Sequence, residues 1–167
     1  PAQPVTEDEI FDLGTFTHSN YPIYAFPYGS ESLESAELTI DTELRIDGVS
    51  QMISSVFEFK HWETPNAEQP CANQEWNYNG INKYGCADRV TFDRNEGSSQ
   101  SVTIGGVEYQ VDIEGFFYNG LLADEFWTKE KRANHSALKG VITAHATVPE
   151  PGTLVLLGMG LLGLGFR

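Results

Sequence analysis

The sequence predicts an all-β protein, a β-sandwich or jelly roll, followed by a hydrophobic C-terminal segment. Short runs of alternating apolar and polar residues follow one another along the chain with turn signals between them, as half-buried strands do. Glycine and aromatic residues are abundant, with 16 Gly, 10 Phe, 7 Tyr and 3 Trp, which is typical of sandwich and jelly-roll domains. We assign residues 1–148 to one β-sandwich domain and residues 149–167 to the hydrophobic segment.

The clearest strand signal is Ala36–Asp47, in which apolar residues face one way and charged residues the other. Further strands are expected at Met52–Trp62, Val90–Phe92, Ser101–Ile104, Val107–Ile113, Phe116–Tyr118, Leu121–Trp127 and Leu138–Val148. Two glycine-containing pairs, Gly105-Gly106 and Asn119-Gly120, predict tight turns within this series.

Two stretches are harder to assign. In Met52–Trp62, the residues Met52, Val56 and Phe57/Phe59 continue the apolar pattern, and we expect them in the core. Ala123–Ala137 is the only stretch of the domain whose pattern is compatible with a helix, and a loop fits it equally well.

The charge of the chain excludes one large class of partners. The formal net charge is −14, and nine acidic residues precede Arg45, the first basic residue. Because binding to phosphate backbones requires clustered cations, we exclude a nucleic-acid partner. Such acidity suits an exported protein with a well-solvated surface.

The two cysteines, Cys71 and Cys86, enclose a polar and aromatic loop. In an exported protein, a pair at this spacing is expected to form a disulfide, worth roughly 3 kcal/mol for a loop of about fifteen residues. Trp76, Tyr78 and Tyr84 lie in the loop beside several asparagines, so it is a candidate ligand-binding loop. Such a composition serves sugar binding and protein contacts equally.

The C-terminal run from Thr153 to Phe166 carries no charge. Its large apolar side chains are Leu154, Val155, Leu156, Leu157, Met159, Leu161, Leu162, Leu164 and Phe166. Exposing all of them to water would cost on the order of 15–20 kcal/mol. We therefore expect burial in a bilayer, in the domain's own core or in another subunit, as a helix or, alternatively, as a donated strand.

This segment resembles the PEP-CTERM sorting signal of Gram-negative surface proteins. The matching positions are Val148, Pro149, Glu150, Pro151, Gly152, Thr153 and Leu154, followed by the Leu/Gly run. The resemblance implies an exosortase as partner, which cuts near the motif during export, and an extracellular or cell-surface location. The family usually ends in several arginines, whereas Arg167 stands alone here. As a helix, fourteen residues span about 21 Å, less than the roughly 30 Å of a bilayer core.

The N-terminal part of the domain carries two further signals. The chain starts at Pro1 without a Met or an apolar leader, as expected of a mature N-terminus after signal-peptide removal. The segment Asp12–Ile23, DLGTFTHSNYPI, resembles the opening of choice-of-anchor domains, in particular type K. That resemblance implies a β-sandwich without assigned activity, placed before a surface-sorting signal.

No stretch of the chain carries a catalytic or metal-binding motif. The four histidines are far apart in sequence, so a structural polar contact is expected for each. The acidic pairs Asp41/Glu43 and Asp112/Glu114 alternate as on the solvent face of a strand. A weak calcium hypothesis rests on a cluster of oxygen ligands, Asp88, Asp93 and Glu96. We expect no enzymatic activity and no cofactor.

These observations favour a non-enzymatic, exported structural protein of the cell surface or extracellular matrix. Its hydrophobic segment would first direct sorting and then dock into neighbouring copies, giving a filament or layer. Two alternatives stay open: a carbohydrate-binding module associated with exopolysaccharide, and a membrane-anchored surface protein awaiting exosortase cleavage.

Overall fold

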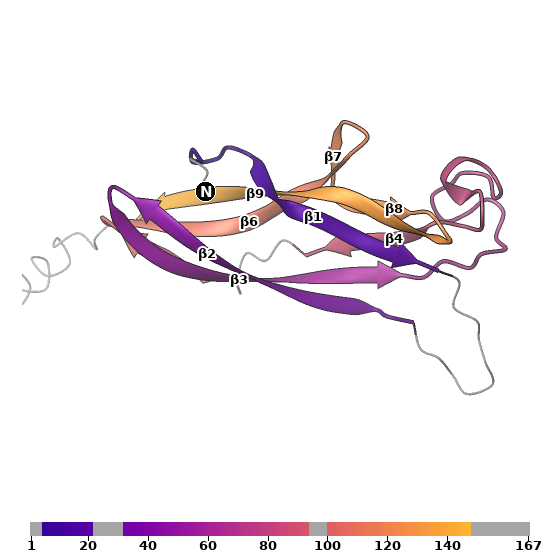
Figure 1. Ribbon diagram of the computed structural model, residues 1–167, viewed down its shortest axis with the longest axis horizontal. Coiled ribbons are helices and arrows are strands. Elements are labelled where there is room, and N and C mark those ends of the chain that lie inside the picture. The colour runs from indigo at the N-terminus through magenta and orange to yellow at the C-terminus, as the bar shows by residue number, and fades with distance from the viewer. Residues whose placement is uncertain (1–4, 22–31, 94–99, 148–167) are drawn as a thin grey trace, which may run out of the picture.

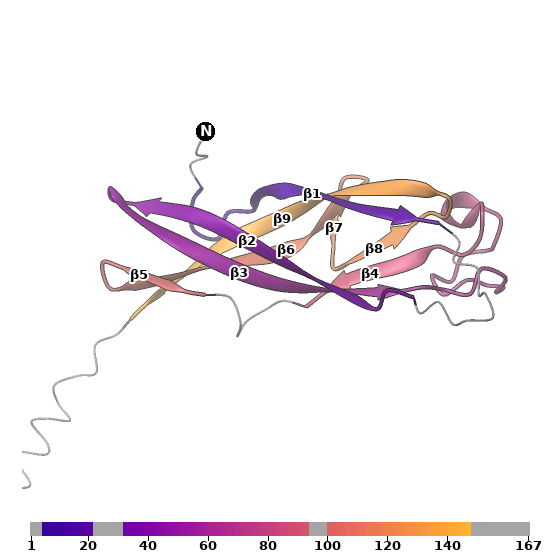
Figure 2. The ribbon, with the colours of Figure 1, turned by 60° about the horizontal axis from the view of Figure 1, so that its bottom comes forward.

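The computed structural model describes residues 5–21, 32–93 and 100–147. Over these residues the chain forms two antiparallel sheets, stacked in an elongated sandwich (Figures 1 and 2). The described ranges contain no α-helix, and their single helical element is a short 3₁₀ turn, η1 (Gly80–Asn82). In this part of the chain no helix is long and apolar enough to cross a bilayer. The all-β prediction is confirmed.

The first sheet has the strand order β1-β9-β6-β5, with β7 also pairing with β6. Its strands are β1 (Phe11–Asn20), β5 (Val102–Ile104), β6 (Val107–Tyr118), β7 (Leu121–Ala123) and β9 (Arg132–Ala146). The second sheet has the order β2-β3-β4-β8. Its strands are β2 (Ser35–Ile46), β3 (Val49–Trp62), β4 (Asp88–Phe92) and β8 (Glu125–Thr128).

Two-residue turns close three of the hairpins. Gly105-Gly106 joins β5 to β6 and Asn119-Gly120 joins β6 to β7, both with positive φ at each residue. These two predicted turns are confirmed. Asp47-Gly48 makes a third turn of the same kind between β2 and β3. Positive φ at both positions matches the twist of the flanking strands, which explains the Gly and Asn at these sites.

Aromatic side chains from the facing surfaces of both sheets form the core. Phe57 and Phe59 of β3 and Phe116 of β6 are at most 5% exposed and belong to one cluster. Phe16 of β1 stacks on Phe59 with ring centroids 5.0 Å apart. A second, smaller cluster consists of Leu44, Ile53, Val111 and Ile142. Both clusters join the two sheets, so the sandwich is one packed unit.

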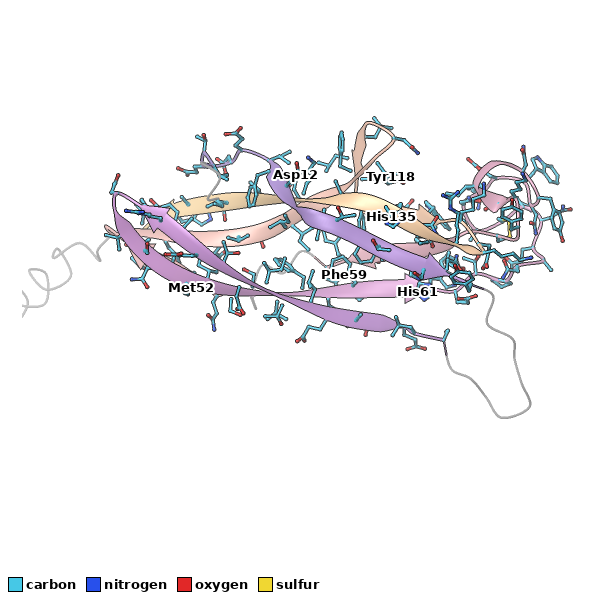
Figure 3. All side chains as sticks on the ribbon, viewed as in Figure 1. Asp12, Met52, Phe59, His61, Tyr118 and His135 are labelled. Atoms are coloured by element: carbon cyan, nitrogen blue, oxygen red, sulfur yellow. A yellow bond between two sulfur atoms is a disulfide. The ribbon has the colours of Figure 1, made fainter. Side chains whose placement is uncertain are left out.

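The predicted alternation holds in β2 and partly fails in β3. In β2, Leu44 and its neighbours at two-residue spacing face inward, and the acidic residues between them are exposed. In β3, Phe57 and Phe59 are buried as predicted, but Met52 is 61% exposed and points away from the sandwich (Figure 3). Because side chains alternate strictly, Met52 and Val56 share the outer face, opposite to Phe57 and Phe59. Their predicted core placement was wrong.

The predicted strand Leu121–Trp127 is divided between the two sheets. β7 pairs with β6 in the first sheet, and β8 pairs with β4 in the second. Ala123–Ala137, for which a helix or a loop was expected, forms neither a helix nor a continuous loop. This stretch supplies β8 and the first part of β9. Cross-strand pairing outweighs the modest helix propensity of its Lys and Glu residues.

The disulfide between Cys71 and Cys86 is present, as predicted, with both cysteines buried. Asn82 lies fully buried inside the loop that they close. Its Oδ1 accepts the backbone N–H of Ala87 at 2.9 Å, and its Nδ2 donates to Asn73 Oδ1 at 3.0 Å. The disulfide loop is therefore organised around one hydrogen-bonded asparagine as well as around the sulfur bridge.

Candidate functional site

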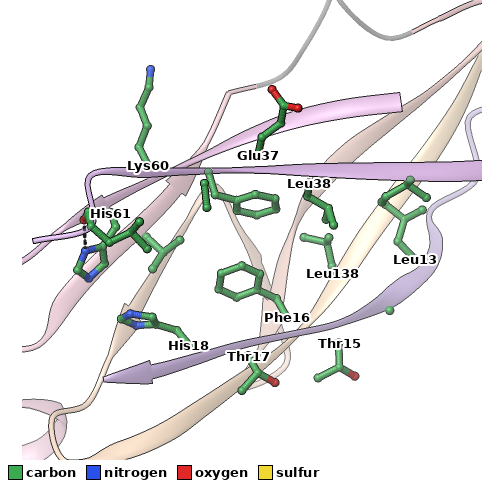
Figure 4. A pocket seen from close by; sticks show the side chains of 16 residues that line it. Leu13, Thr15, Phe16, Thr17, His18, Glu37, Leu38, Lys60, His61 and Leu138 are labelled. Atoms are coloured by element: carbon green, nitrogen blue, oxygen red, sulfur yellow. Dashed lines mark hydrogen bonds between the residues drawn. The ribbon is translucent and has the colours of Figure 1, made fainter. Parts of the chain in front are cut away.

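A groove opens between β1 and β2, which are edge strands of the two sheets (Figure 4). In the described residues β1 pairs only with β9 and β2 only with β3, so each has an unpaired edge. The groove has a volume of about 430 Å³. Its apolar lining residues include Leu13, Phe16, Leu38, Ile40, Phe59 and Leu138. We call this feature the β1–β2 groove.

A bulge in β1 shapes one wall of this groove. The pairing of β1 with β9 shifts register between Asp12 and Gly14, and Leu13 packs against both core clusters. Opposite it lies Gly140 of β9, where an added Cβ would come within 2.6 Å of the Leu13 side chain. Glycine at position 140 thus makes room for Leu13 at the base of the groove.

One end of the groove is polar. His18 of β1 and His61 of β3 meet there, with ring centroids 4.8 Å apart (Figure 4). His61, Glu63 and Asp88 each offer one donor atom, and these atoms all lie within 4.8 Å of one another. Glu63 also interacts electrostatically with Glu130. We call His61, Glu63, Asp88 and Glu130 the polar cluster.

Strand pairing brings the polar cluster together. Trp62 at the end of β3 pairs with Arg89 of β4, so the next residue, Glu63, lies beside Asp88. His61 and Glu63 are two residues apart and therefore project to the same face. That face is the inner one, because Asp88 begins the buried side of β4 and the His61 side chain is only 9% exposed.

Several buried atoms of the cluster have no hydrogen-bond partner. Asp88 Oδ1 accepts the backbone N–H of Thr64 at 2.7 Å, but Oδ2 accepts none and lies 3.9 Å from His61 Nε2. Glu130 is fully buried, with Oε1 accepting from Asn66 Nδ2 at 3.1 Å and Oε2 unsatisfied. Buried polar groups are satisfied in the great majority of cases, so these exceptions require an explanation.

The carboxyl groups of the cluster are all biased toward the neutral form. Burial, followed by the charges of Asp88 and Glu130, raises the pKa of Glu63 to about 7. Burial likewise raises the pKa of Asp88 and that of Glu130. These carboxyl groups are largely shielded from water. When they are ionised, their negative charges repel one another, and a bound cation would reduce that repulsion.

His18 lies at the junction of the cluster and the groove. Burial, with a smaller effect of His61, lowers the pKa of His18 to about 4. Its Nδ1 is 2.9 Å from the Thr128 hydroxyl at the end of β8. A neutral His18 therefore links the edge strand of the first sheet to the edge strand of the second.

The structure separates most of the other predicted site residues from this cluster. Asp88 begins β4 and Asp93 follows its last residue, about 16 Å away at 3.3 Å per residue, so they cannot share one calcium ion. Asp93 instead pairs with Lys60. Glu96, the third residue of that hypothesis, lies outside the described residues. The calcium site predicted from these three residues is wrong.

The predicted ligand loop is exposed at the end of the sandwich that holds the polar cluster (Figure 3). Trp76, Tyr78 and Tyr84 are 67%, 69% and 47% exposed. Tyr84 is flanked by two cations, with the Nζ of Lys83 5.4 Å and that of Lys129 5.6 Å from its ring centroid. The sorting residues 148–154 and the apolar residues 154–166 lie outside the described part of the chain.

Sequence patterns alone did not identify the polar cluster. The available signal was the two-residue spacing of His61 and Glu63 at the end of a strand, together with Asp88 two residues after Cys86. Each hint is weak, because the third carboxylate, Glu130, is more than forty residues further along the chain. Their meeting depends on the pairing of β3, β4 and β8.

Comparison with protein families identifies one segment. Residues 147–167 match the PEP-CTERM protein-sorting motif, which confirms the resemblance read from the sequence. The chain thus carries the signal of bacterial proteins that are exported, processed by an exosortase and sorted to the surface. No curated protein matches the chain. The likeness of Asp12–Ile23 to type K choice-of-anchor domains stays a prediction.

Proposed function

We propose that this chain is a non-enzymatic structural protein of the cell surface that assembles into a filament or layer. Export and sorting follow from the PEP-CTERM motif. Assembly is supported above all by the β1–β2 groove, which is apolar and lies between two strands with unpaired edges. An extended peptide that enters such a groove gains main-chain hydrogen bonds along with apolar burial.

The proposed occupant is the segment Leu154–Phe166 of a second copy. This segment is apolar and uncharged. The groove is lined mainly by apolar side chains, against which the segment could be buried. Six residues of β1, Leu13–His18, line the groove, a length of roughly 20 Å. About half of the fourteen-residue run would fill that length as a strand, so the donated-strand alternative suits this groove better than a helix.

The position of β9 favours a head-to-tail arrangement. β9 begins beside the His18 end of β1, since Asn134 pairs with His18. It ends at Ala146, paired with Val107 near the opposite end of the sandwich. The last strand therefore ends away from the polar end of the groove. Contacts between different surfaces of identical subunits produce open polymers when the rotation does not close.

Electron microscopy of the secreted protein and light scattering test this proposal. Intact chain should form polymers, and deletion of residues 154–166 should leave monomers. Ala36→Arg places a charge in the groove and should also block assembly, whereas Thr39→Arg, on the opposite face of the same strand, should not. Polymers that persist in the deletion or in Ala36→Arg would overturn the assembly mechanism.

Intact-mass spectrometry of the native surface protein adds a separate test. A full mass, including residues 154–166, supports assembly through the tail. A mass that ends near Pro149–Pro151 shows that the exosortase has removed the tail, and the proposed occupant is then wrong.

A carbohydrate-binding module is the second candidate function. Three exposed aromatic side chains on the disulfide loop support it. A glycan array should show binding that is lost in Trp76→Ala and kept in Met52→Ala, which removes an exposed side chain elsewhere. No binding, or equal binding by both variants, removes this candidate.

A further inference from the structure

We propose that His61, Glu63 and Asp88 form a binding site for a first-row divalent transition-metal ion such as Zn²⁺. This inference does not depend on assembly or on sugar binding. Its basis is the convergence of one imidazole and two carboxylates, whose donor atoms lie within 4.8 Å of one another. Two ligands of the same ion stand about 3–4 Å apart, because metal–ligand bonds are about 2.0–2.2 Å long. The observed 3.9 Å between His61 Nε2 and Asp88 Oδ2 fits that spacing.

His61 is oriented as metal-ligating histidines are. Its Nδ1 lies 2.8 Å from the backbone carbonyl oxygen of Leu33, which can only accept a hydrogen bond. Nδ1 therefore carries a proton, which leaves Nε2, the nitrogen that faces Asp88, as the one available to a metal ion. Histidine ligands commonly donate their second N–H to a backbone carbonyl in this way, which fixes both the tautomer and the ring.

Two buried atoms with no hydrogen-bond partner point to a missing ligand. Asp88 Oδ2 belongs to a side chain with no exposed surface, and His61 Nε2 to one that is 9% exposed. Leaving such atoms unsatisfied costs about 1–3 kcal/mol each. A shared proton between Glu63 and Asp88 satisfies carboxylate oxygens alone, and a proton on His61 Nε2 satisfies only that nitrogen and Asp88 Oδ2. A metal ion satisfies all three donors.

The donor set selects the class of metal. Ca²⁺ and Mg²⁺ prefer sites built from oxygen ligands alone. An imidazole nitrogen beside carboxylates suits Zn²⁺ and its first-row neighbours better. Fully buried Glu130 lies close enough to influence both Glu63 and Asp88 electrostatically, and it places a further carboxyl group beside the three donor atoms.

The site has an entry path from solvent. Glu63 is partly exposed and, with His61, lines a shallow polar depression of about 480 Å³. Glu34 and Glu58 also line it together with Lys60, which pairs with Asp93, so acidic side chains outnumber basic ones along this path. The same His61 ring closes the end of the β1–β2 groove, which places a bound ion next to that surface.

Titration calorimetry on the full chain, first treated with a chelator, tests the proposal with Zn²⁺ and separately with Ca²⁺. We expect one Zn²⁺ per chain, and binding weakened by at least about tenfold in His61→Gln and in Asp88→Asn. Co²⁺ in place of Zn²⁺ should give a visible absorption band that His61→Gln abolishes. Ca²⁺ should bind more weakly, with no change in His61→Gln.

Matched controls are His135→Gln and Asp41→Asn, which change an exposed histidine and an exposed aspartate elsewhere. Both should bind Zn²⁺ as the unmodified chain does. If Asp88→Asn does not fold by circular dichroism, Glu63→Gln, at a half-buried position, takes its place. The proposal is overturned by absence of stoichiometric Zn²⁺ binding, by equal affinity of His61→Gln and His135→Gln, or by a preference for Ca²⁺.

Discussion

Asn82 and Asp88 lie six residues apart, are both fully buried, and differ in how their polar atoms are satisfied. The Asn82 amide makes hydrogen bonds through both its oxygen and its nitrogen inside the disulfide loop. Asp88 has one oxygen satisfied by Thr64 and the other with no hydrogen-bond partner, facing His61. A buried polar group with all its hydrogen bonds stabilises the loop around it, whereas a buried polar group without a partner calls for an explanation. Within one short stretch, Asn82 is thus explained by the fold, and for Asp88 we propose a bound metal ion.

The largest effect is expected for Asn82→Ala. The substitution leaves the Ala87 N–H and the Asn73 side chain without their partner in a buried loop. We expect the free energy of unfolding to fall by about 3 kcal/mol, measured by urea denaturation. Asn79→Ala, which removes only the exposed cap of η1, should cost about 1 kcal/mol or less. Equal losses in the two variants would contradict the role assigned to Asn82.

A somewhat smaller effect is expected for Gly85→Ala, at the point where the loop meets the polar cluster. Gly85 has a φ of +134°, and an added Cβ would lie 2.0 Å from Asn66 Oδ1. We expect a loss of about 2 kcal/mol in stability together with weaker Zn²⁺ binding, because Asn66 holds Glu130. Gly14→Ala, where an added Cβ meets no atom within 4 Å, is the control and should leave metal affinity unchanged.

The pH dependence of stability should reveal the lowered pKa of His18. The pKa of His18 is about 4 in the folded chain, against 6.5 ordinarily. Below pH 6.5 the unfolded chain therefore binds a proton at His18, whereas the folded chain binds it only near pH 4. This lowers stability as pH falls from about 6.5 to 4. The raised pKa values of Glu63, Asp88 and Glu130 act in the opposite direction, so total stability does not isolate His18.

The informative quantity is the difference in unfolding free energy between the unmodified chain and His18→Gln. It should decrease by about 1–2 kcal/mol over that pH range, after allowance for the partial exposure of the ring. A difference that stays constant between pH 4 and 7 would show that His18 is not held neutral.

The smallest change in stability is expected for Glu63→Gln in metal-free protein, and this change is an increase rather than a loss. Removing one of several converging charges should raise stability by about 1 kcal/mol at pH 7.5. With Zn²⁺ present, the same variant should be less stable than the unmodified chain, because a ligand is gone. Thermal melts with and without Zn²⁺ measure both signs, and destabilisation in both conditions would place Glu63 with Asn82 as a structural residue.

Local patterns revealed much of the fold, and pairing between distant strands determined the rest. The alternation of Ala36–Asp47 and the turns at Gly105-Gly106 and Asn119-Gly120 are local properties, and the structure contains them. The break within Leu121–Trp127 is not local, because β7 and β8 join different sheets. Met52 was misplaced because Phe57 and Phe59, at odd spacing from it, decide which face of β3 is buried.

The polar cluster was less predictable than the fold for the same reason. Cys71 and Cys86 enclose one loop, and their pairing was predictable because they are the two cysteines of a chain expected to be exported. The meeting of Glu63, Asp88 and Glu130 requires three strands in register, and no short motif encodes it. The sorting motif lies at the other extreme, since its residues are contiguous and it was identified without any knowledge of the fold.

The disulfide lies next to the proposed metal site in the sequence. Cys86 is two residues before Asp88, and the loop that it closes contributes Gly85 beside Asn66. A disulfide of this kind does not persist in a reducing cytoplasm, so the loop is expected to close after export. We therefore expect the proposed metal site to bind its ion after export, and we expect reduction of the disulfide to weaken Zn²⁺ binding in the calorimetric titration.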